Sequence, residues 1–149
     1  MSGDLEFGEI RVGTAEYDSE LEMRHRILRE PLGIEWTDDE RAWEKTERHF
    51  GMVVGGKVVA CVLARDLGEG AMKLRQMAVE PERQNSGVGK NLLEKVEDVL
   101  RGKGTTRFEL NARDLAVGFY EKLGYEKVGE EFVEVGIAHW KMRKDVVVD

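Results

Sequence analysis

The sequence has little cysteine and no long apolar run, and each scarcity excludes something. Among 149 residues there is one cysteine, Cys61, so an intramolecular disulfide is excluded and a reducing cytoplasm is the natural setting. The longest apolar run, Val58–Ala64, is too short to cross a bilayer. No basic segment leading into an apolar stretch is visible near residue 1, so no signal peptide is expected. These absences predict a soluble, cytoplasmic protein with no membrane partner and with Cys61 buried in its core.

Positive charge is outweighed by negative charge. The chain has 23 Lys and Arg against 30 Asp and Glu, a net charge of −7. Binding to nucleic acid needs clustered Lys and Arg, and no basic stripe appears, so no nucleic-acid partner is expected. An acidic surface favours a cationic acceptor such as an amine. The local group Arg24, His25, Arg26 and Arg29 is interpreted as a solvated helix face.

The length of 149 residues and the hydrophobic content of 41% predict a single domain over residues 1–149. Apolar periodicity and turn residues predict its elements. The first part of the chain is predicted to hold a weak strand within 5–17, a helix capped by Ser19-x-x-Glu22 and ended by Pro31 and Gly33, and a short helix from Thr37-x-x-Glu40 to about Arg48. A hairpin over 50–65 around Gly55-Gly56 follows, and then strands 71–80 and 105–110 on either side of a helix 88–101. The last elements are a helix with apolar Leu115, Phe119 and Leu123 and a closing hairpin over 125–143. This order predicts an α+β fold whose sheet has a parallel centre.

The most informative segment is the glycine-rich turn Gln84–Lys90, between the strand 71–80 and the helix 88–101. The first-turn N–H groups of a helix have no partner within it, and the helix dipole adds partial positive charge there. Gly87 and Gly89 carry no Cβ, so a ligand can approach the backbone closely. The segment therefore predicts a phosphate-binding loop, although a plain strand-to-helix turn has the same composition.

Two common phosphate motifs fail on spacing. A P-loop requires a glycine five residues before Gly89, where Gln84 stands, and a hydroxyl residue after Lys90, where Asn91 stands. A dinucleotide fingerprint requires a third glycine at the position of Leu92. A nucleotide-hydrolysing protein is therefore disfavoured.

The pattern that fits is Gln-x-x-Gly-x-Gly over residues 84–89, which resembles the acyl-CoA loop of the GNAT superfamily of N-acyltransferases. A second block, Phe119-Tyr120-Glu121-Lys122-Leu123-Gly124-Tyr125, is similar to the helix-to-strand signature of the same family. The resemblance covers roughly residues 49–143. It implies a mixed, partly splayed central sheet of six to seven strands with about four helices on its faces. It also implies acetyl transfer from acetyl-CoA to a small-molecule amine or a protein amino group, without a metal.

The resemblance assigns roles to particular residues. Tyr120 stands at the position that commonly protonates the departing thiolate, and Ala112 and Ala116 precede it at helical spacing. The backbone N–H of Met77 would stabilise the oxyanion, and the backbone of Met77–Val79 would bind the pantetheine arm like an added strand. The diphosphate of CoA would bind the loop, helped by Arg83. The residues expected at the cofactor are Met77, Ala78, Val79, Gln84, Asn85, Ser86, Gly87, Val88, Gly89, Lys90 and Asn111.

Other roles stay open at this point. Arg113 stands where many family members have asparagine, and Asn111 is carried over in its place. The general base has three candidates, Glu109, Glu134 and His139, because an amine must lose a proton when it attacks. The acceptor is not readable, a homodimer is a fair default for such families, and a non-catalytic acyl-CoA sensor is the main alternative to an enzyme.

Overall fold

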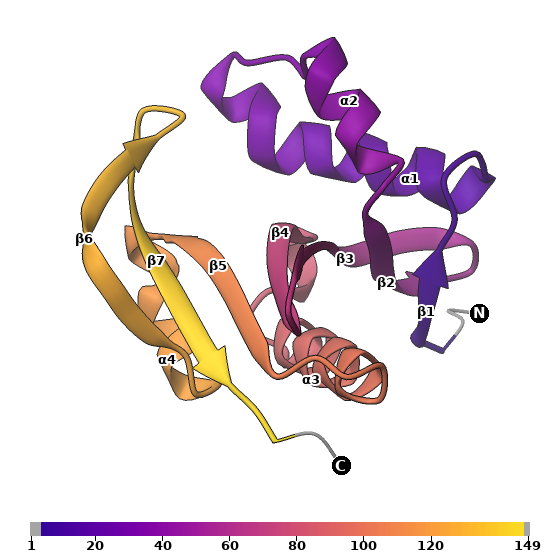
Figure 1. Ribbon diagram of the computed structural model, residues 1–149. Helices are drawn as coiled ribbons and strands as arrows, with labels where there is room; N and C mark the ends of the chain where they lie inside the picture. The colour runs from indigo at the N-terminus through magenta and orange to yellow at the C-terminus, as the bar shows by residue number, and fades with distance from the viewer. Residues whose placement is uncertain (1–3, 148–149) are drawn as a thin grey trace.

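The computed structural model describes residues 4–147, and its centre is a seven-stranded mixed sheet (Figure 1). The strands lie in the order β1-β2-β3-β4-β5-β7-β6. Within residues 4–147, β4 and β5 pair in parallel and every other neighbouring pair is antiparallel. The predicted α+β sheet with a parallel centre is confirmed. The strands are β1 Glu6–Ile10, β2 Arg48–Val54, β3 Lys57–Gly68, β4 Ala71–Val79, β5 Arg107–Arg113, β6 Glu126–Glu134 and β7 Ile137–Asp145.

Four α-helices cover the two faces of this sheet (Figure 1). α1 (Ala15–Arg24) and α2 (Asp38–Glu44) lie on one face, whereas α3 (Val88–Arg101) and α4 (Val117–Lys122) lie on the opposite face. Leu92, Leu93 and Val96 of α3 are fully buried against the apolar strand residues of the larger core cluster. A smaller cluster under α1 contains Cys61, which is fully buried as predicted.

The N-terminal elements differ in their bounds from the sequence prediction. α1 begins at Ala15, because the hydroxyl of Thr14 accepts the N–H of Tyr17 at 3.2 Å and caps the helix. The predicted cap residue Ser19 lies inside α1, where its Oγ accepts the N–H of Val58 at 3.0 Å. The predicted capping box at Thr37 and Glu40 is confirmed. α2 ends at Glu44 rather than near Arg48, because Arg48 already pairs in β2.

The region before Tyr120 was also predicted wrongly in one respect. Ala112 does not share a helix with Tyr120, because β5 continues to Arg113 and its residue pairs with β7 extend to the Arg113–His139 pair. Asn111 therefore lies within the strand and not at its end. The helix α4 has only six residues, preceded by a 3-10 turn at Asp114–Ala116.

The sheet divides between β4 and β5. These strands pair only over Ala71–Leu74 and Arg107–Leu110. Beyond Leu74, β4 stays paired with β3, while β5 stays paired with β7. The halves of the sheet therefore diverge, as Figure 1 shows for β4 and the β5–β7–β6 group. The predicted splaying is confirmed, and it leaves backbone groups on both sides of the split unpaired within the sheet.

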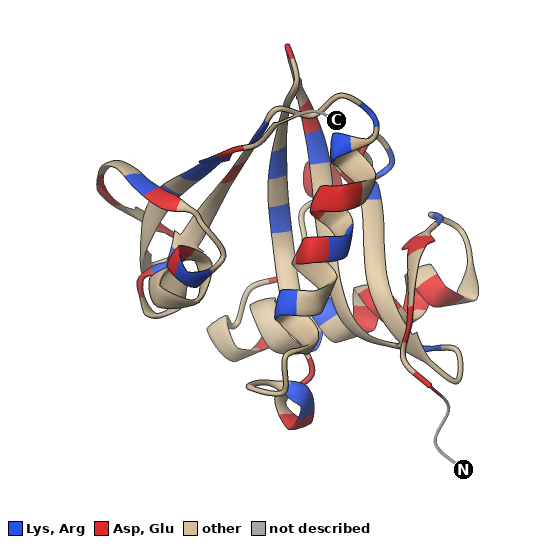
Figure 2. Ribbon diagram, turned by 90° about the horizontal axis from the view of Figure 1, so that it is seen from below, with Lys and Arg blue, Asp and Glu red and all other residues tan. Residues whose placement is uncertain are grey.

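Charges of both signs alternate along the outer surface of α3 (Figure 2). Within the described residues, no helix is both long enough and apolar enough to cross a membrane.

Candidate active site

A cleft of about 980 Å³ occupies the split between β4 and β5 and reaches both faces of the sheet. Most residues expected from the sequence meet here, from four strands, one loop and two helices. Ser86, Val88 and Glu109 do not line it: Ser86 is exposed, and Val88 packs into the core. The expected residues that line the cleft are Met77, Ala78, Val79, Gln84, Asn85, Gly87, Gly89, Lys90, Asn111, Tyr120, Glu134 and His139.

The edge of β4 along the split presents free backbone groups. The N–H of Glu80 donates to the carbonyl of Val59 at 2.9 Å, so this pair is a hydrogen-bonded one. Hydrogen-bonded and non-bonded pairs alternate along antiparallel strands, and the next pair is Val79 with Ala60. The N–H and C=O of Val79 therefore point away from β3 and into the split, where the carbonyl accepts from the side-chain amide of Gln84 and the N–H stays open to a ligand. An extended ligand could bond to this edge as an added strand does.

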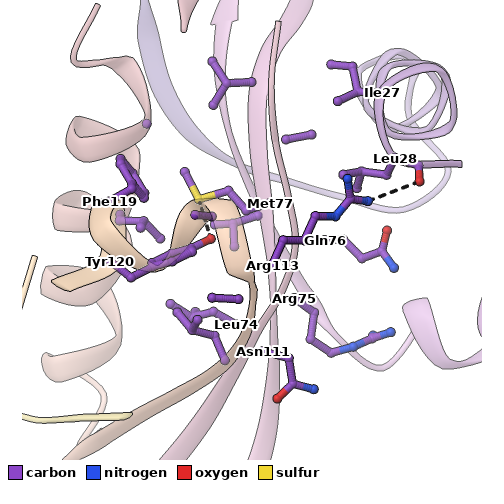
Figure 3. A pocket seen from close by; sticks show the side chains of 18 of the residues that line it. Ile27, Leu28, Leu74, Arg75, Gln76, Met77, Asn111, Arg113, Phe119 and Tyr120 are labelled. Carbon is purple, nitrogen blue, oxygen red and sulfur yellow. Dashed lines mark hydrogen bonds between the residues drawn. The ribbon is translucent and has the colours of Figure 1, made fainter. Parts of the chain in front are cut away.

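A β-bulge sets the direction of the neighbouring residues. The β3–β4 register shifts between the pairs Cys61–Ala78 and Leu63–Arg75, which places one extra residue in β4. Gln76 at this bulge has φ of 55°, a left-handed conformation that is costly for a residue with a side chain. Because of the extra residue, the side chains of Arg75 and Gln76 lie on the same side of the strand, and that of Met77 lies on the opposite side, as Figure 3 shows.

The loop before α3 leaves its helix N-terminus open to a ligand. Gly87 is the N-cap residue, with φ of 87°, and no side chain caps the helix. A Cβ at Gly87 would meet no atom within 4 Å, so the space beside it is empty. The amide of Gln84 instead donates to the carbonyl of Val79 at 3.1 Å and ties the loop to β4. Uncapped N–H groups, with Arg83 and Lys90 lining the same cleft, suit an anion such as a diphosphate.

Tyr120 reaches the split from α4. Its hydroxyl lies 3.5 Å from Sδ of Met77, and both side chains lie on the same side of the strand (Figure 3). Its ring packs edge-on against Phe119 and Tyr125, with centroid distances of 5.0 and 5.9 Å. Burial raises the pKa of Tyr120 to about 12, so the phenol keeps its proton at neutral pH. A protonated phenol at this position can act as a proton donor.

The three candidates for the base are not equivalent. Glu109 forms an ion pair with Lys141 at 3.1 Å and lies outside the cleft lining. His139 lines the cleft, and its Nδ1 lies 2.7 Å from the carbonyl of Ile137. A carbonyl only accepts, so Nδ1 carries the hydrogen and the neutral ring has its lone pair on Nε2. Glu134 lies 3.5 Å from this Nε2.

Several polar residues on the α1 and α2 side of the cleft were not expected from the sequence. They include Arg65 of β3, Lys73, Arg75 and Gln76 of β4, and Arg113 of β5. The alternation of charged Lys73 and Arg75 with apolar Met72 and Leu74 was the available signal, because alternate strand residues point to opposite faces. In Figure 3, Asn111 lies on the same side as Arg75, away from Tyr120.

The predicted solvated basic face of α1 is wrong at Arg24, which is fully buried. Its guanidinium bonds Glu20 at 3.0 Å and Glu44 at 2.6 Å. His49 completes this group, with Nδ1 2.9 Å from Glu20. Glu20, Glu44 and His49 are metal-ligand types that lie close together. Their ligand atoms are already occupied by Arg24 and by one another, so the cluster is a buried ion-pair network.

A family model covers most of the chain. The family model described as "Acetyltransferase (GNAT) domain" matches residues 35–146. This chain belongs to the GNAT acetyltransferase family. The resemblance inferred from the two sequence motifs is thereby confirmed, and membership supports acyl transfer as the general chemistry.

Relatives and solved structures agree with this GNAT assignment. An uncharacterized N-acetyltransferase of Bacillus subtilis, YjcF, is 34% identical over 103 residues, which cover 68% of this chain and 73% of that protein. Two other Bacillus subtilis relatives are each 36% identical, but the matches cover only 55% and 49% of their lengths. The crystal structure of an acyl-CoA N-acyltransferase from Pseudomonas aeruginosa superposes with a TM-score of 0.81 at 19% identity, covering 95% of this chain and 99% of that one. A GNAT family acetyltransferase from Elizabethkingia anophelis with acetyl-CoA bound has a TM-score of 0.71 at 15% identity, covering 95% and 98%. These structures share the fold.

Proposed function

We propose that this GNAT protein transfers an acetyl group from acetyl-CoA to an amine by direct attack, with Tyr120 as the general acid. The observation that carries the proposal is the convergence of two separate motifs on one split. The hydroxyl of Tyr120 from the second motif lies beside Met77, on the strand that leads into the glycine loop of the first.

Acetyl-CoA fits the donor half of the cleft by its chemistry. Its diphosphate matches the uncapped start of α3 at Gly87, and its extended pantetheine arm matches the edge of β4 at Val79, whose N–H points into the split. Met77, Ala78, Gln84, Asn85, Gly89 and Lys90 complete this half, while Ser86 and Val88 contribute only through their backbone. The family relative with acetyl-CoA bound supports this choice of donor. The predicted contact of Asn111 with CoA stays a prediction, because its side chain lies on the face of Arg75 (Figure 3).

The reaction requires one bond to form and one to break. The amine nitrogen attacks the thioester carbon, the C–N bond forms, and the C–S bond breaks. The N–H of Met77 is the proposed oxyanion donor. The nitrogen gives up one proton, for which Nε2 of His139 is the best placed base of the three candidates. The leaving thiolate takes a proton from Tyr120. Burial disfavours the charged form of both groups, so it raises the pKa of the CoA thiol as well as that of the Tyr120 phenol. The proton donor and the proton acceptor therefore shift in the same direction.

Calorimetric titration with acetyl-CoA, followed on the same sample by a thiol-release assay across an amine panel, tests the proposal. Binding followed by release of CoA on addition of an amine supports it. Binding without release from any amine favours an acyl-CoA sensor. No binding refutes the assignment of residues 84–90.

A further inference from the structure

The acceptor half of the cleft, on the α1 and α2 side of the sheet, has a wall of cationic side chains. This cationic wall consists of Arg65, Lys73, Arg75 and Arg113, all of which line the cleft. Leu74 packs into the core under α3, so Lys73 and Arg75 point to the opposite face. Figure 3 shows Arg75 and Arg113 on the side of the strand away from Tyr120. These groups are therefore separate from the glycine loop and α3, where the diphosphate of CoA is proposed to bind.

The carboxylates near the wall do not neutralise it. Glu47 lies 2.5 Å from Arg75 and 3.4 Å from Nε of Arg65, so one carboxylate serves two guanidinium groups. Arg29 and Glu40, which also line the cleft, pair with each other at 2.5 Å and cancel. Among the described lining residues, Glu134 is the remaining carboxylate. Glu109 is aligned with Lys73 across β4 and β5, but it pairs with Lys141 at 3.1 Å. The four cations of the wall therefore face two carboxylates, Glu47 and Glu134, and positive charge is in excess.

Two donors of the wall lack partners. Among residues 4–147, Lys73 has no hydrogen bond and no carboxylate at ion-pair distance, and Glu134 acts on it only through its charge. Nη2 of Arg65 is buried without an acceptor in the same part of the chain. Burial, followed by the positive charge of Arg75, lowers the pKa of Lys73. Buried donors that find no acceptor in the protein are costly, and such groups in a cleft commonly meet a ligand.

The same half of the cleft also offers groups to an ammonium. Oε1 of Gln76 is buried without a donor, and Glu134 has no Lys or Arg partner among the described residues. Donors for an anion and acceptors for a cation therefore lie in one compartment. A molecule with both charges would satisfy both sets.

We propose that the amine acceptor also carries an anionic group, a carboxylate or a phosphate, which is bound by Lys73 and Arg65. This inference rests on the proposed acyl transfer and names its substrate class. The net charge of −7 suggests a cationic acceptor, but the charge of the whole surface affects steering at a distance, whereas the cleft wall contacts the ligand. A charge-assisted hydrogen bond to a partly buried cation favours the anionic ligand by about tenfold or more.

Matched amines separate the charge from the rest of the molecule. β-Alanine against β-alaninamide tests a carboxylate, O-phosphoethanolamine against ethanolamine tests a phosphate, and putrescine represents a second cation. Each is titrated calorimetrically into the protein saturated with CoA, and each is tested for CoA release with acetyl-CoA. We expect the anionic member of at least one pair to be preferred by about tenfold in affinity or in kcat/KM. The pair that shows it identifies carboxylate or phosphate.

Variants locate the preference. Lys73→Met should reduce the preference to near unity, and Lys73→Arg should restore it. Lys127→Met is the matched control, because it removes a positive charge from β6, outside the cleft lining, where Lys127 lies over the ring of Trp140, and the preference should be retained. Equal treatment of both members of each pair, better use of putrescine, or no binding of any anionic amine overturns the inference. The acyl transfer is refuted instead if acetyl-CoA does not bind or if no amine releases CoA. In that case the calorimetric comparison of the matched amines still decides the charge preference.

Discussion

The hydroxyl of Tyr120 lies 3.5 Å from the sulfur of Met77, across the split where β4 and β5 separate. The two residues are 43 positions apart in the chain. This contact places the Tyr120 hydroxyl, a proton donor, beside the edge of β4 that is proposed to hold the thioester. A thioether is a weak acceptor, so this contact leaves the phenol available to a better one.

Replacing Tyr120 by phenylalanine should separate chemistry from binding. The ring contacts with Phe119 and Tyr125 remain, while the proton donor is lost. We expect kcat to fall by about 10²-fold or more, as for removal of a general acid, with the Kd of acetyl-CoA within about twofold. Thiol release and calorimetric titration measure the two quantities. An unchanged kcat would show that another group protonates the thiolate.

The raised pKa of Tyr120, about 12, also predicts the alkaline side of the pH profile. A general acid works in its protonated form, which for Tyr120 predominates at every pH well below that value. We therefore expect kcat for saturating substrates to stay level between about pH 8 and 10, where an unperturbed phenol would begin to ionise. Ultraviolet difference titration of the tyrosines, compared with Tyr120→Phe, assigns the pKa. A fall in kcat that follows a phenol titrating near 10 would contradict the argument.

Gly87 offers a test of the loop that does not disturb the fold. Asparagine tolerates the left-handed conformation at its φ of 87°, and a Cβ there meets no protein atom. Gly87→Asn should keep its Tm within a few degrees but weaken acetyl-CoA binding by about tenfold or more, because the side chain enters the space proposed for phosphate. Gly129→Asn is the control, since Gly129 has φ of 75°, equally open surroundings and a place outside the cleft. Equal affinities in both variants would refute the loop assignment.

His139→Asn examines the proposed base. The asparagine amide can still donate to the carbonyl of Ile137, but it lacks the lone pair of Nε2. We expect kcat/KM to fall by about 10²-fold to 10⁴-fold, as for removal of a general base. Glu109→Gln provides the comparison, because Glu109 faces Lys141 outside the cleft. An unchanged kcat/KM in His139→Asn would assign the base elsewhere.

The sequence predicted those features that depend on local residue patterns. The turn at Gly55-Gly56, the end of α4 at Gly124 and the loop at residues 84–90 follow from glycine positions, and the strands follow from alternation. The Ala112 prediction failed because residues 111–116 show no apolar period that separates a strand end from a helix start. Tertiary pairing with β7 decides that boundary.

The site was predictable on the donor side and not on the acceptor side. The donor side consists of contiguous motifs, whereas Arg65, Lys73 and Arg113 come from three strands and meet only through the sheet register. Arg24 illustrates the same limit. Its burial depends on Glu44, 20 positions away, and nothing local to Arg24 indicates that partner.

The buried network around His49 predicts how stability depends on pH. Nε2 lies 2.8 Å from the carbonyl of Glu44 and Nδ1 lies 2.9 Å from Glu20, so both ring nitrogens face acceptors and the doubly protonated ring is the form that fits. Burial alone would lower the pKa of His49, but the hydrogen bond and charge of Glu20 outweigh it, and the pKa is raised above 6.5.

The folded state therefore binds the His49 proton more tightly than the unfolded state. This contribution to stability is complete below the unfolded pKa near 6.5 and is lost as the pH rises through the folded pKa. We expect the free energy of unfolding, measured with urea, to decline from pH 6.5 upward. Glu20→Gln keeps a hydrogen-bond acceptor but removes the charge, so its decline should be smaller. Direct NMR titration of the His49 ring gives the folded pKa without any variant, and a value below 6.5 would contradict the argument, because the charged ring would then not be the one the cluster stabilises.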